Sequence, residues 1–322
     1  MLNIKSCRVL VTPTSYAKND SKLRSYLEEQ VGEVIYNTLD RPLKSHELVE
    51  LIPEVDGYIA GLDEINKDVI EAAERLKVIA RYGVGVDAVD LQASRAKGII
   101  ITNTPGANSA SVAELTVGLM LSLARNIPQA VQATKSGNWP RFRGRSLVGK
   151  MVGLLGFGSI GKQVGRRLSG FDCEMIAYDP IPDRDTADRF GVSMVNLGEL
   201  IRWSDFLSLH IPSSTETRGI VDAEFLSEMK HGSYLINTSR GELVDETALL
   251  KALESDKLNG AALDVFDKQP PDPINPLLIH PKVLTTPHIG AHTDGAADAM
   301  GWGALLDCLA VLNGEEPQNR VI

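Results

Sequence analysis

The sequence has few cysteines, and they lie far from one another. Cys7, Cys173 and Cys308 are isolated and odd in number. A metal site needs more closely spaced ligands, so we expect no bound metal. Isolated thiols are typical of a reducing compartment, and we expect all three to be buried.

Long apolar runs are also absent, and basic residues are fewer than acidic ones. The apolar runs fall short of the roughly 20 residues that a membrane-spanning helix needs. Residues 1–11 lack the apolar stretch of a signal peptide. The formal net charge of −9 disfavours binding to nucleic acid, or to an anionic membrane by charge. We therefore expect a cytoplasmic protein with neither kind of partner.

What the sequence does contain is a regular alternation of short β-branched runs and amphipathic segments. The 322 residues, 43% of them hydrophobic and 23% charged, suit a soluble protein of about two domains. The alternation predicts the α/β class with parallel sheets. Strands are expected at 8–11, 57–60, 78–80, 99–101, 151–155, 174–178, 206–209, 234–236, 261–263 and 282–285. Helices are expected at 21–30, 68–75, 109–125 and 294–312.

A glycine-rich turn follows one of these strands. Gly156, Gly158 and Gly161 have the Gly-x-Gly-x-x-Gly spacing and open a helical segment at 162–168. In a dinucleotide site these glycines make the tight turn, admit the pyrophosphate and let helix pack on strand. Asp179 ends the next strand, where a carboxylate bonds ribose hydroxyls and repels a 2′-phosphate. The pattern favours NAD over NADP, the alternative being a plain structural turn.

Two other polar residues end strands of the same region. His210 either faces a nicotinamide or is a hydrogen-bonded histidine at a strand end. Asp264 either accepts a hydrogen bond from the carboxamide or is a helix N-cap or surface residue.

Arg240 and His288 are the candidates for chemistry. An arginine at the exit of a buried strand is unfavourable unless it holds an anion, so Arg240 is a candidate clamp for a small carboxylate. His288 follows Pro287 at the end of a strand, and histidine suits proton transfer near neutral pH. His280 and His292 are alternatives nearby.

Together these residues resemble the D-isomer-specific 2-hydroxyacid dehydrogenase family, in its phosphoglycerate-dehydrogenase-like branch, in short form without a regulatory tail. The resemblance implies an NAD-dependent oxidoreductase acting on the CH-OH group of a small 2-hydroxy acid, or on the matching 2-keto acid. Glyoxylate, hydroxypyruvate and 3-phosphoglycerate are examples. The motifs that carry it are 81–87, 103–106, 111–115, 156–161, 237–245 and 286–290.

The family also implies an architecture. Residues 1–100 and 291–322 would form a flavodoxin-like substrate-binding domain. A Rossmann NAD-binding domain, residues 101–290, would be inserted into it, with the substrate in the cleft between them. The helix that begins at Ser109 and the arm through Trp139 would form the interface of a homodimer.

The resemblance further assigns residues to roles. The catalytic residues would be Arg240, Gln269 and His288. The substrate would be bound by Tyr82, Val84, Gly85, Asn108 and Arg240. The cofactor would be bound by Gly156, Gly158, Ser159, Ile160, Gly161, Asp179, His210, Ile211, Pro212, Thr238, Ser239, Asp264 and Gly290.

One departure from the family concerns the catalytic acid. Gln269 stands before Pro270, where the family usually has glutamate. A glutamine orients a histidine but brings no charge, so ketoacid reduction should favour acidic pH. Asp267 or Asp272 is an alternative source of charge. Formate dehydrogenases of the superfamily are similar in using glutamine here, which leaves formate oxidation without a general base as an alternative. A dinucleotide-sensing scaffold, like the family's corepressor relatives, is another.

A second departure concerns phosphate. Phosphoglycerate dehydrogenases carry an arginine after the strand that here ends at Ile59, whereas this chain has Ala60 to Glu64 with two acids. This disfavours a phosphorylated substrate. Arg141, Arg143 or Arg145, supplied by a second subunit, would be the alternative phosphate ligands.

Overall fold

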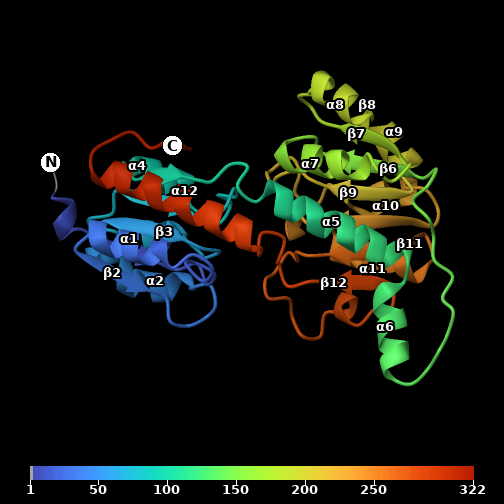
Figure 1. Ribbon diagram of the computed structural model, residues 1–322, viewed down its shortest axis with the longest axis horizontal. Coiled ribbons are helices and arrows are strands. Elements are labelled where there is room, and N and C mark those ends of the chain that lie inside the picture. The colour runs from blue at the N-terminus through green and yellow to red at the C-terminus, as the bar shows by residue number, and fades with distance from the viewer. Residues whose placement is uncertain (1–2) are drawn as a thin grey trace. The chain divides into compact units, whose positions relative to one another are not determined.

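The computed structural model describes residues 3–322 and divides them into two compact units (Figure 1). The outer unit takes the residues up to Asn108 together with Ala291–Ile322, and the inserted unit is Ser109–Gly290. The boundary expected after residue 100 falls within β5 (Ile100–Thr102). Because β5 pairs with the strand before it, the outer unit continues past that boundary.

The outer unit is built on a five-stranded parallel sheet in the order β2-β1-β3-β4-β5. Its strands are β1 (Arg8–Val11), β2 (Glu33–Tyr36), β3 (Gly57–Ala60), β4 (Val78–Arg81) and β5. Its helices are α1 (Lys22–Gln30), α2 (Ser45–Leu51), α3 (Lys67–Ala72), α4 (Leu91–Ala96) and α12 (Asp294–Leu312), with 3₁₀ turns η1 (Ile4–Ser6) and η2 (Ile52–Glu54).

Helix α12 returns the chain to the outer unit after the insertion. It begins at the N-cap Thr293 and packs against α1, β3, β4 and β5. Among the described residues it is the one helix long and apolar enough to cross a membrane, and 61% of that stretch is buried within the protein. Its apolar composition is therefore that of a core helix, with the buried Leu305 and Cys308 in the centre of a hydrophobic cluster.

The inserted unit is built on a seven-stranded parallel sheet in the order β12-β11-β10-β9-β6-β7-β8. Its strands are β6 (Met151–Leu155), β7 (Glu174–Tyr178), β8 (Val192–Met194), β9 (Phe206–Leu209), β10 (Ser233–Asn237), β11 (Leu258–Leu263) and β12 (Val283–Thr285). Its helices are α5 (Ser109–Ala124), α6 (Ile127–Lys135), α7 (Ser159–Leu168), α8 (Arg184–Phe190), α9 (Leu197–Trp203), α10 (Ala223–Glu228) and α11 (Glu246–Glu254), with 3₁₀ turns η3 (Gly241–Leu243) and η4 (Pro276–Leu278).

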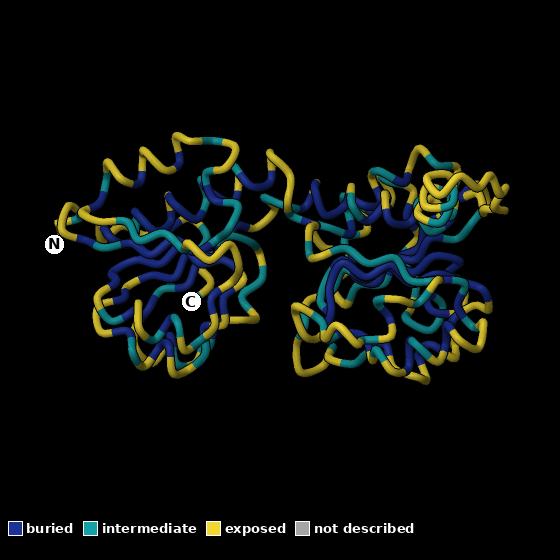
Figure 2. The backbone as a smooth tube through the Cα atoms, turned by 90° about the horizontal axis from the view of Figure 1, so that it is seen from below, coloured by how far each residue is buried: buried dark blue, intermediate teal, exposed yellow. Residues whose placement is uncertain are grey.

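Helices cover both faces of this sheet, so its central strands are apolar throughout. One hydrophobic cluster joins the sheet to α9, α10 and α11, and another joins it to α5, α7 and α8. Figure 2 shows the central strands as dark blue, buried stretches of the backbone tube between these layers. All the pairings are parallel, so the strands end at one edge of the sheet.

The strand order decides which turns are neighbours at that edge. Along it, the turns after β12, β11, β10, β9, β6 and β7 bring His288, Asp264, Arg240, His210, Gly156 and Asp179 in that sequence. The order reverses between β9 and β6, and such a switch point is where open α/β sheets bind ligands.

Candidate active site

The glycine turn after β6 requires glycine at two of its three positions and is open at the third. Gly156 has φ +98°, and a Cβ there would lie 2.6 Å from the His210 carbonyl oxygen. A Cβ on Gly161 would lie 2.2 Å from the carbonyl oxygen of Gly156, so the helix could not pack on the turn. At Gly158, the N-cap of α7, a Cβ would meet nothing within 4 Å. The turn therefore presents bare backbone and a helix N-terminus to open space, which suits a pyrophosphate.

Asp179 is fixed against this turn at the end of β7. Its Oδ2 accepts the Phe157 N–H at 2.8 Å and its Oδ1 accepts the Ile181 N–H at 2.9 Å. The two bonds hold a negative charge beside the glycine turn, next to the N-terminus of α7. A ribose would meet an acceptor there and a 2′-phosphate would meet repulsion. Among the described residues, this arrangement fits NAD.

His210 lies under the same turn, after β9. Both of its ring nitrogens are buried and neither has a hydrogen-bond partner among residues 3–322. Burial lowers the pKa of His210 to about 3, so the ring is neutral at physiological pH. The alternative of a histidine hydrogen-bonded at the strand end thus has no partner for the ring among residues 3–322. Its neighbour Ile211 accepts a hydrogen bond from the Ser239 hydroxyl through its carbonyl oxygen.

Asp264, after β11, organises the loop that carries His288. The side chain is 1% exposed, so it is neither a surface residue nor a helix N-cap. Its Oδ1 accepts from Thr286 Oγ1 at 2.5 Å and from Ile289 N at 2.9 Å, and its Oδ2 accepts from Gly290 N at 2.9 Å. Its carbonyl oxygen accepts the His288 N–H at 2.8 Å. His288 is held with φ +54° by these bonds.

Arg240 lies in the turn between β10 and α11. The Asn237 side chain spans this turn, donating to the Arg240 carbonyl oxygen at 2.8 Å and accepting from Ser239 N at 3.0 Å. Arg240 Nη1 donates to the Ser239 carbonyl oxygen at 2.8 Å. Thr238, just before, shares a 2.8 Å hydroxyl hydrogen bond with Thr116 of α5. The guanidinium is thus tethered at the edge of the sheet where β11 and β9 also end.

His288 and Gln269 contact each other directly. Their Nδ1 and Oε1 atoms are 2.6 Å apart, and Gln269 Nε2 donates to the Phe266 carbonyl oxygen at 3.1 Å. A reversed amide would place two acceptors against each other at Phe266, so the amide orientation is fixed. An amide oxygen only accepts, so His288 Nδ1 carries the proton. In the neutral ring, Nε2 is then the basic nitrogen.

Asp267 and Asp272, the alternative sources of charge, and the competing His280 all have other hydrogen-bond or ion-pair partners. Asp267 pairs with Arg218 at 3.2 Å, and Asp272 accepts from the Ile274 N–H at 3.1 Å within its own turn. His280 Nδ1 accepts from the Lys282 N–H. Gln269 is thus the observed partner of His288 Nδ1.

The expected substrate-binding residues Tyr82, Val84, Gly85 and Asn108 all belong to the outer unit. Asn103 donates to the Val84 carbonyl oxygen at 2.8 Å and Arg81 donates to that of Gly85 at 3.1 Å. Neither the Val84 nor the Gly85 N–H is hydrogen-bonded within residues 3–322. This leaves two backbone donors in one exposed loop.

The other two assigned residues of this set have different surroundings. The Tyr82 hydroxyl donates to the Ala297 carbonyl oxygen at 2.8 Å, and burial raises the pKa of that hydroxyl. Asn108 Oδ1 is buried, and no described residue hydrogen-bonds it.

Metal chemistry finds no support in the described part of the chain. Residues 3–322 contain no group of three or more His, Cys, Asp or Glu arranged to hold a metal ion. Cys7 and Cys308 are fully buried as expected, whereas Cys173 is only partly buried.

The sequence interpretation missed two residues that shape the site. Gly241 follows Arg240, and a Cβ there would lie 1.9 Å from the Phe266 carbonyl carbon. Glu246, at the start of α11, accepts from the Asp267 N–H at 3.1 Å and from Asn275 Nδ2 at 2.6 Å. The signal for Gly241 was its place beside Arg240. Glu246 gave none, because a glutamate in the first turn of a helix is ordinary.

Comparison with known proteins agrees with this geometry. Residues 117–290 match the family described as D-isomer specific 2-hydroxyacid dehydrogenase, NAD binding domain. A D-3-phosphoglycerate dehydrogenase of Methanocaldococcus jannaschii is 45% identical over 91% of this chain and 56% of its own length. The chain thus spans little more than half of that relative. A hydroxypyruvate reductase of Thermotoga maritima is 44% identical over 80% of this chain and 85% of its own.

A solved structure extends the likeness to the whole chain. The NAD-dependent formate dehydrogenase of Staphylococcus aureus, in complex with NAD, is 29% identical with a TM-score of 0.87. The match covers 98% of this chain and 99% of that one.

Proposed function

Because the chain belongs to the D-isomer specific 2-hydroxyacid dehydrogenase family, we propose that it is an NAD-dependent dehydrogenase of a small 2-hydroxy acid. In the reverse direction it would reduce the matching 2-keto acid. The observation that carries the proposal is the pairing of His288 with Gln269 at the same sheet edge as the tethered Arg240. A neighbouring glycine turn fits the cofactor.

Different residues of the inserted unit would bind the cofactor and the substrate at that edge of the sheet. The nicotinamide of bound NAD would accept or supply the hydride. The bare backbone at Gly158 and the Asp179 carboxylate would hold the pyrophosphate and ribose of the cofactor. Arg240 would hold the substrate carboxylate and the reacting oxygen, where its charge stabilises developing negative charge.

Proton transfer would use the two nitrogens of His288 differently. Gln269 keeps a proton on Nδ1, so Nε2 of the neutral ring accepts the hydroxyl proton when the 2-hydroxy acid is oxidised. Reduction needs the doubly protonated ring, from which Nε2 donates to the carbonyl oxygen. A neutral amide partner brings no charge that would favour the doubly protonated ring, so reduction should be favoured on the acidic side.

The substrate class follows from the loop after β3. No basic residue stands in Ala60–Glu64. Asp63, which the sequence suggested as a repelling charge, is fully buried and accepts from Leu43 N at 2.7 Å and Gly61 N at 2.9 Å. It therefore shapes the loop, and the missing arginine together with the exposed Glu64 argues against a phosphorylated acid. An unphosphorylated 2-keto acid such as glyoxylate or hydroxypyruvate is the favoured substrate.

The two units would have different tasks. The inserted unit would bind NAD, and the outer unit would bind the substrate carboxylate through the N–H groups of Val84 and Gly85, with Tyr82 and Asn108 near them. We assign the NAD contacts to Gly156, Gly158, Ser159, Ile160, Gly161, Asp179, His210, Ile211, Pro212, Thr238, Ser239, Asp264 and Gly290. Of these, Asp264 would act mainly by holding the Gly290 loop.

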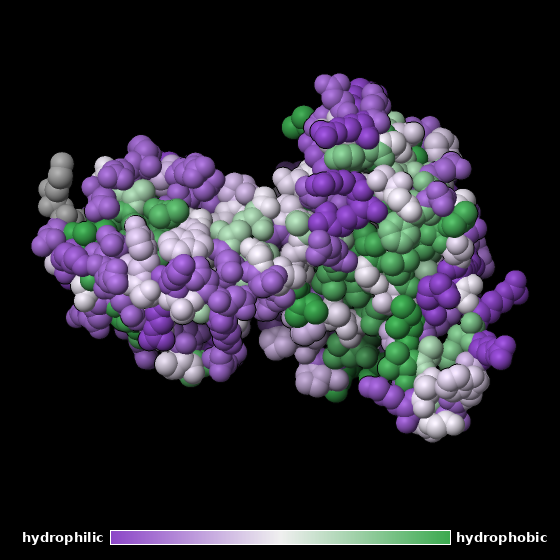
Figure 3. Space-filling model, viewed as in Figure 1, coloured by the Kyte–Doolittle hydropathy of each residue, from purple (hydrophilic) through white to green (hydrophobic). Residues whose placement is uncertain are grey.

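A homodimer in the cytoplasm is also proposed. Figure 3 shows apolar side chains gathered over α5 and α6 of the inserted unit. Near them Ile127, Val131, Trp139, Phe142 and Val148 are all exposed, Trp139 by 80%. A patch of this kind marks an interaction surface. Light scattering should give twice the chain mass, and Trp139→Glu should give the monomer.

The function is tested by following NADH oxidation at pH 6 with glyoxylate, hydroxypyruvate, pyruvate and 3-phosphohydroxypyruvate. We expect turnover with an unphosphorylated acid and its loss in Arg240→Ala. NADH binding without turnover of any acid would contradict the proposal. Preference for the phosphorylated acid would overturn only the substrate class.

Formate oxidation is the second candidate, because Gln269 favours it. That reaction transfers hydride without a general base. NAD reduction by formate that survives His288→Gln would establish this alternative in place of the first.

A further inference from the structure

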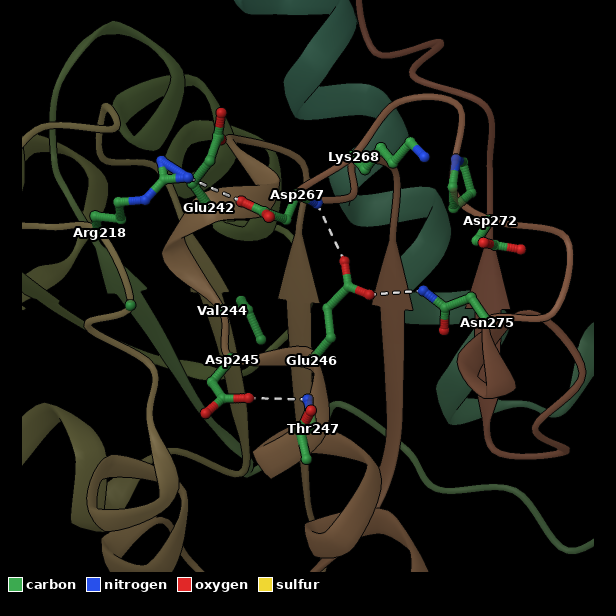
Figure 4. Close-up of a pocket in the computed structure, with 12 residues that line it drawn as sticks. Arg218, Glu242, Val244, Asp245, Glu246, Thr247, Asp267, Lys268, Asp272 and Asn275 are labelled. Atoms are coloured by element: carbon green, nitrogen blue, oxygen red, sulfur yellow. Dashed lines mark hydrogen bonds and ion pairs between the residues drawn. The ribbon is translucent and has the colours of Figure 1, made fainter.

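Glu246 joins three separate segments of the inserted unit. Its Oε1 accepts from the Asp267 N–H at 3.1 Å, and its Oε2 accepts from Asn275 Nδ2 at 2.6 Å. Figure 4 shows Glu246 between these two partners, at a cavity of roughly 430 Å³. Its partners lie 21 and 29 residues along the chain. The carboxylate therefore does more than stabilise the first turn of its own helix.

The Asp267 N–H belongs to the same peptide unit as the Phe266 carbonyl. That carbonyl oxygen accepts from Gln269 Nε2 at 3.1 Å. Glu246 thus holds one end of a peptide plane whose other end orients the Gln269 amide. Gly241 closes the arrangement, because its missing Cβ leaves room for the carbonyl carbon and oxygen of this peptide. Rotation of the plane would break both hydrogen bonds.

We propose that Glu246 is a positioning residue for proton transfer, acting through the Phe266–Asp267 peptide and Gln269 to keep the proton of His288 on Nδ1. The catalytic consequence of this proposal rests on the proposed function. The position of the proton on the His288 ring follows from geometry alone. Contact runs without a break from Glu246 Oε1 to Asp267 N, from Phe266 O to Gln269 Nε2, and from Gln269 Oε1 to His288 Nδ1.

A carboxylate is required because Glu246 meets two donors. The Asn275 amide cannot turn to offer its oxygen, since Asn275 Oδ1 already accepts the Leu277 N–H at 3.0 Å. In Glu246→Gln, one oxygen would still accept from Asp267 while the new NH₂ group faced Asn275 Nδ2. This nearly isosteric variant should therefore keep the fold and loosen the clamp, and Glu246→Ala should release it.

The first test measures the ring of His288 directly, without turnover. Nitrogen-15 NMR of the histidine rings, assigned with His288→Gln, reports which nitrogen holds the proton at pH 8. We expect the Nδ1–H form in the wild type and a mixture with the Nε2–H form in Glu246→Gln, Glu246→Ala and Gln269→Ala. Asp272 lines the same cavity, but its carboxylate accepts a hydrogen bond within its own turn. The control variant Asp272→Ala should therefore keep the wild-type spectrum. Wild-type spectra in both Glu246 variants would overturn the proposal.

The second test is a double-mutant cycle on kcat for ketoacid reduction. Misplacement of a catalytic group by an ångström can lower a rate by up to about a hundredfold, so we expect Glu246→Ala to lose roughly tenfold or more. In a Gln269→Ala background the same change should have little further effect, because the pathway is already cut. Equal effects in both backgrounds would overturn the proposal. Failure of the wild type to turn over any 2-keto acid would instead refute the proposed function, leaving the NMR test valid.

Discussion

Two histidines at the same edge of one sheet have opposite surroundings. His288 follows β12 and has Gln269 Oε1 2.6 Å from its Nδ1. His210 follows β9, and both of its ring nitrogens are buried without a hydrogen-bond partner among the described residues. Burial lowers the pKa of His210 to about 3. The first ring is equipped to exchange a proton, and the second is kept neutral.

The difference shows that residue type and position at a strand end do not assign a role. A histidine becomes an acid or base when a fixed acceptor decides which nitrogen carries the proton. At His288 the acceptor is fixed by the Phe266 peptide. At His210 the backbone lies against the glycine turn, where a Cβ on Gly156 would touch its carbonyl group, and the ring nitrogens are buried without a partner among the described residues. His210 would thus contribute a neutral surface beside the cofactor.

Replacement of each histidine by glutamine tests the comparison most severely. His288→Gln removes the proton carrier, and general acid–base groups contribute about 10²- to 10⁴-fold to rates. We expect a loss of kcat in that range. His210→Gln should retain kcat within several-fold, because it moves no proton. Steady-state kinetics of ketoacid reduction check both, and similar losses in the two variants would remove the distinction.

Gly241→Ala should disturb His288 while sparing His210. The new Cβ would lie 1.9 Å from the Phe266 carbonyl carbon, so the peptide that orients Gln269 must shift. We expect kcat to fall by up to about a hundredfold, with NADH affinity, measured by fluorescence titration, little changed. Gly170→Ala is the matched control, because a Cβ there meets nothing within 4 Å. If Gly241→Ala lost NADH binding while Gly170→Ala kept it, the expectation that only the surroundings of His288 are disturbed would be contradicted.

The free energy of unfolding should depend on pH through the buried ring of His210. Its folded pKa lies below the ordinary value of about 6.5. Below pH 6.5 the unfolded chain therefore takes up a proton that the folded chain does not, and the free energy of unfolding falls as pH decreases towards 3. His210→Gln should flatten this fall, and the exposed His231→Gln should not. Urea unfolding at pH 5 and pH 8 measures the difference.

The positions of the two histidines at one sheet edge were predictable from the sequence, because the motifs mark the strand ends. The glycine spacing and the position of Asp179 identify a dinucleotide turn, and parallel strands must place their following residues at one edge. The state of His210 was not predictable. Whether a strand-end ring finds a partner depends on side chains from turns far away in the chain.

The omissions have a physical pattern as well. The strands β2 (Glu33–Tyr36) and β8 (Val192–Met194) were not anticipated. Both lie at the outside of their sheets and are only partly buried, so their sequences lack the continuous apolar run of central strands. Expected strand ends elsewhere differ by a few residues, as at Leu258–Leu263. Asp63 was counted as one of two acids that disfavour a phosphate, and its burial was not anticipated, because its backbone partners come from loop geometry.

We propose His288 as the proton donor for ketoacid reduction, held by Gln269, which carries no charge. The most direct measurement is the pH profile of kcat from pH 5 to 9 for the wild type and Gln269→Glu. A carboxylate beside His288 favours its charged form, so the pKa of His288 should rise. We predict a wild-type rate that falls as pH rises, and a Gln269→Glu rate that holds to higher pH before it falls. Superimposable profiles from an active enzyme would contradict the account.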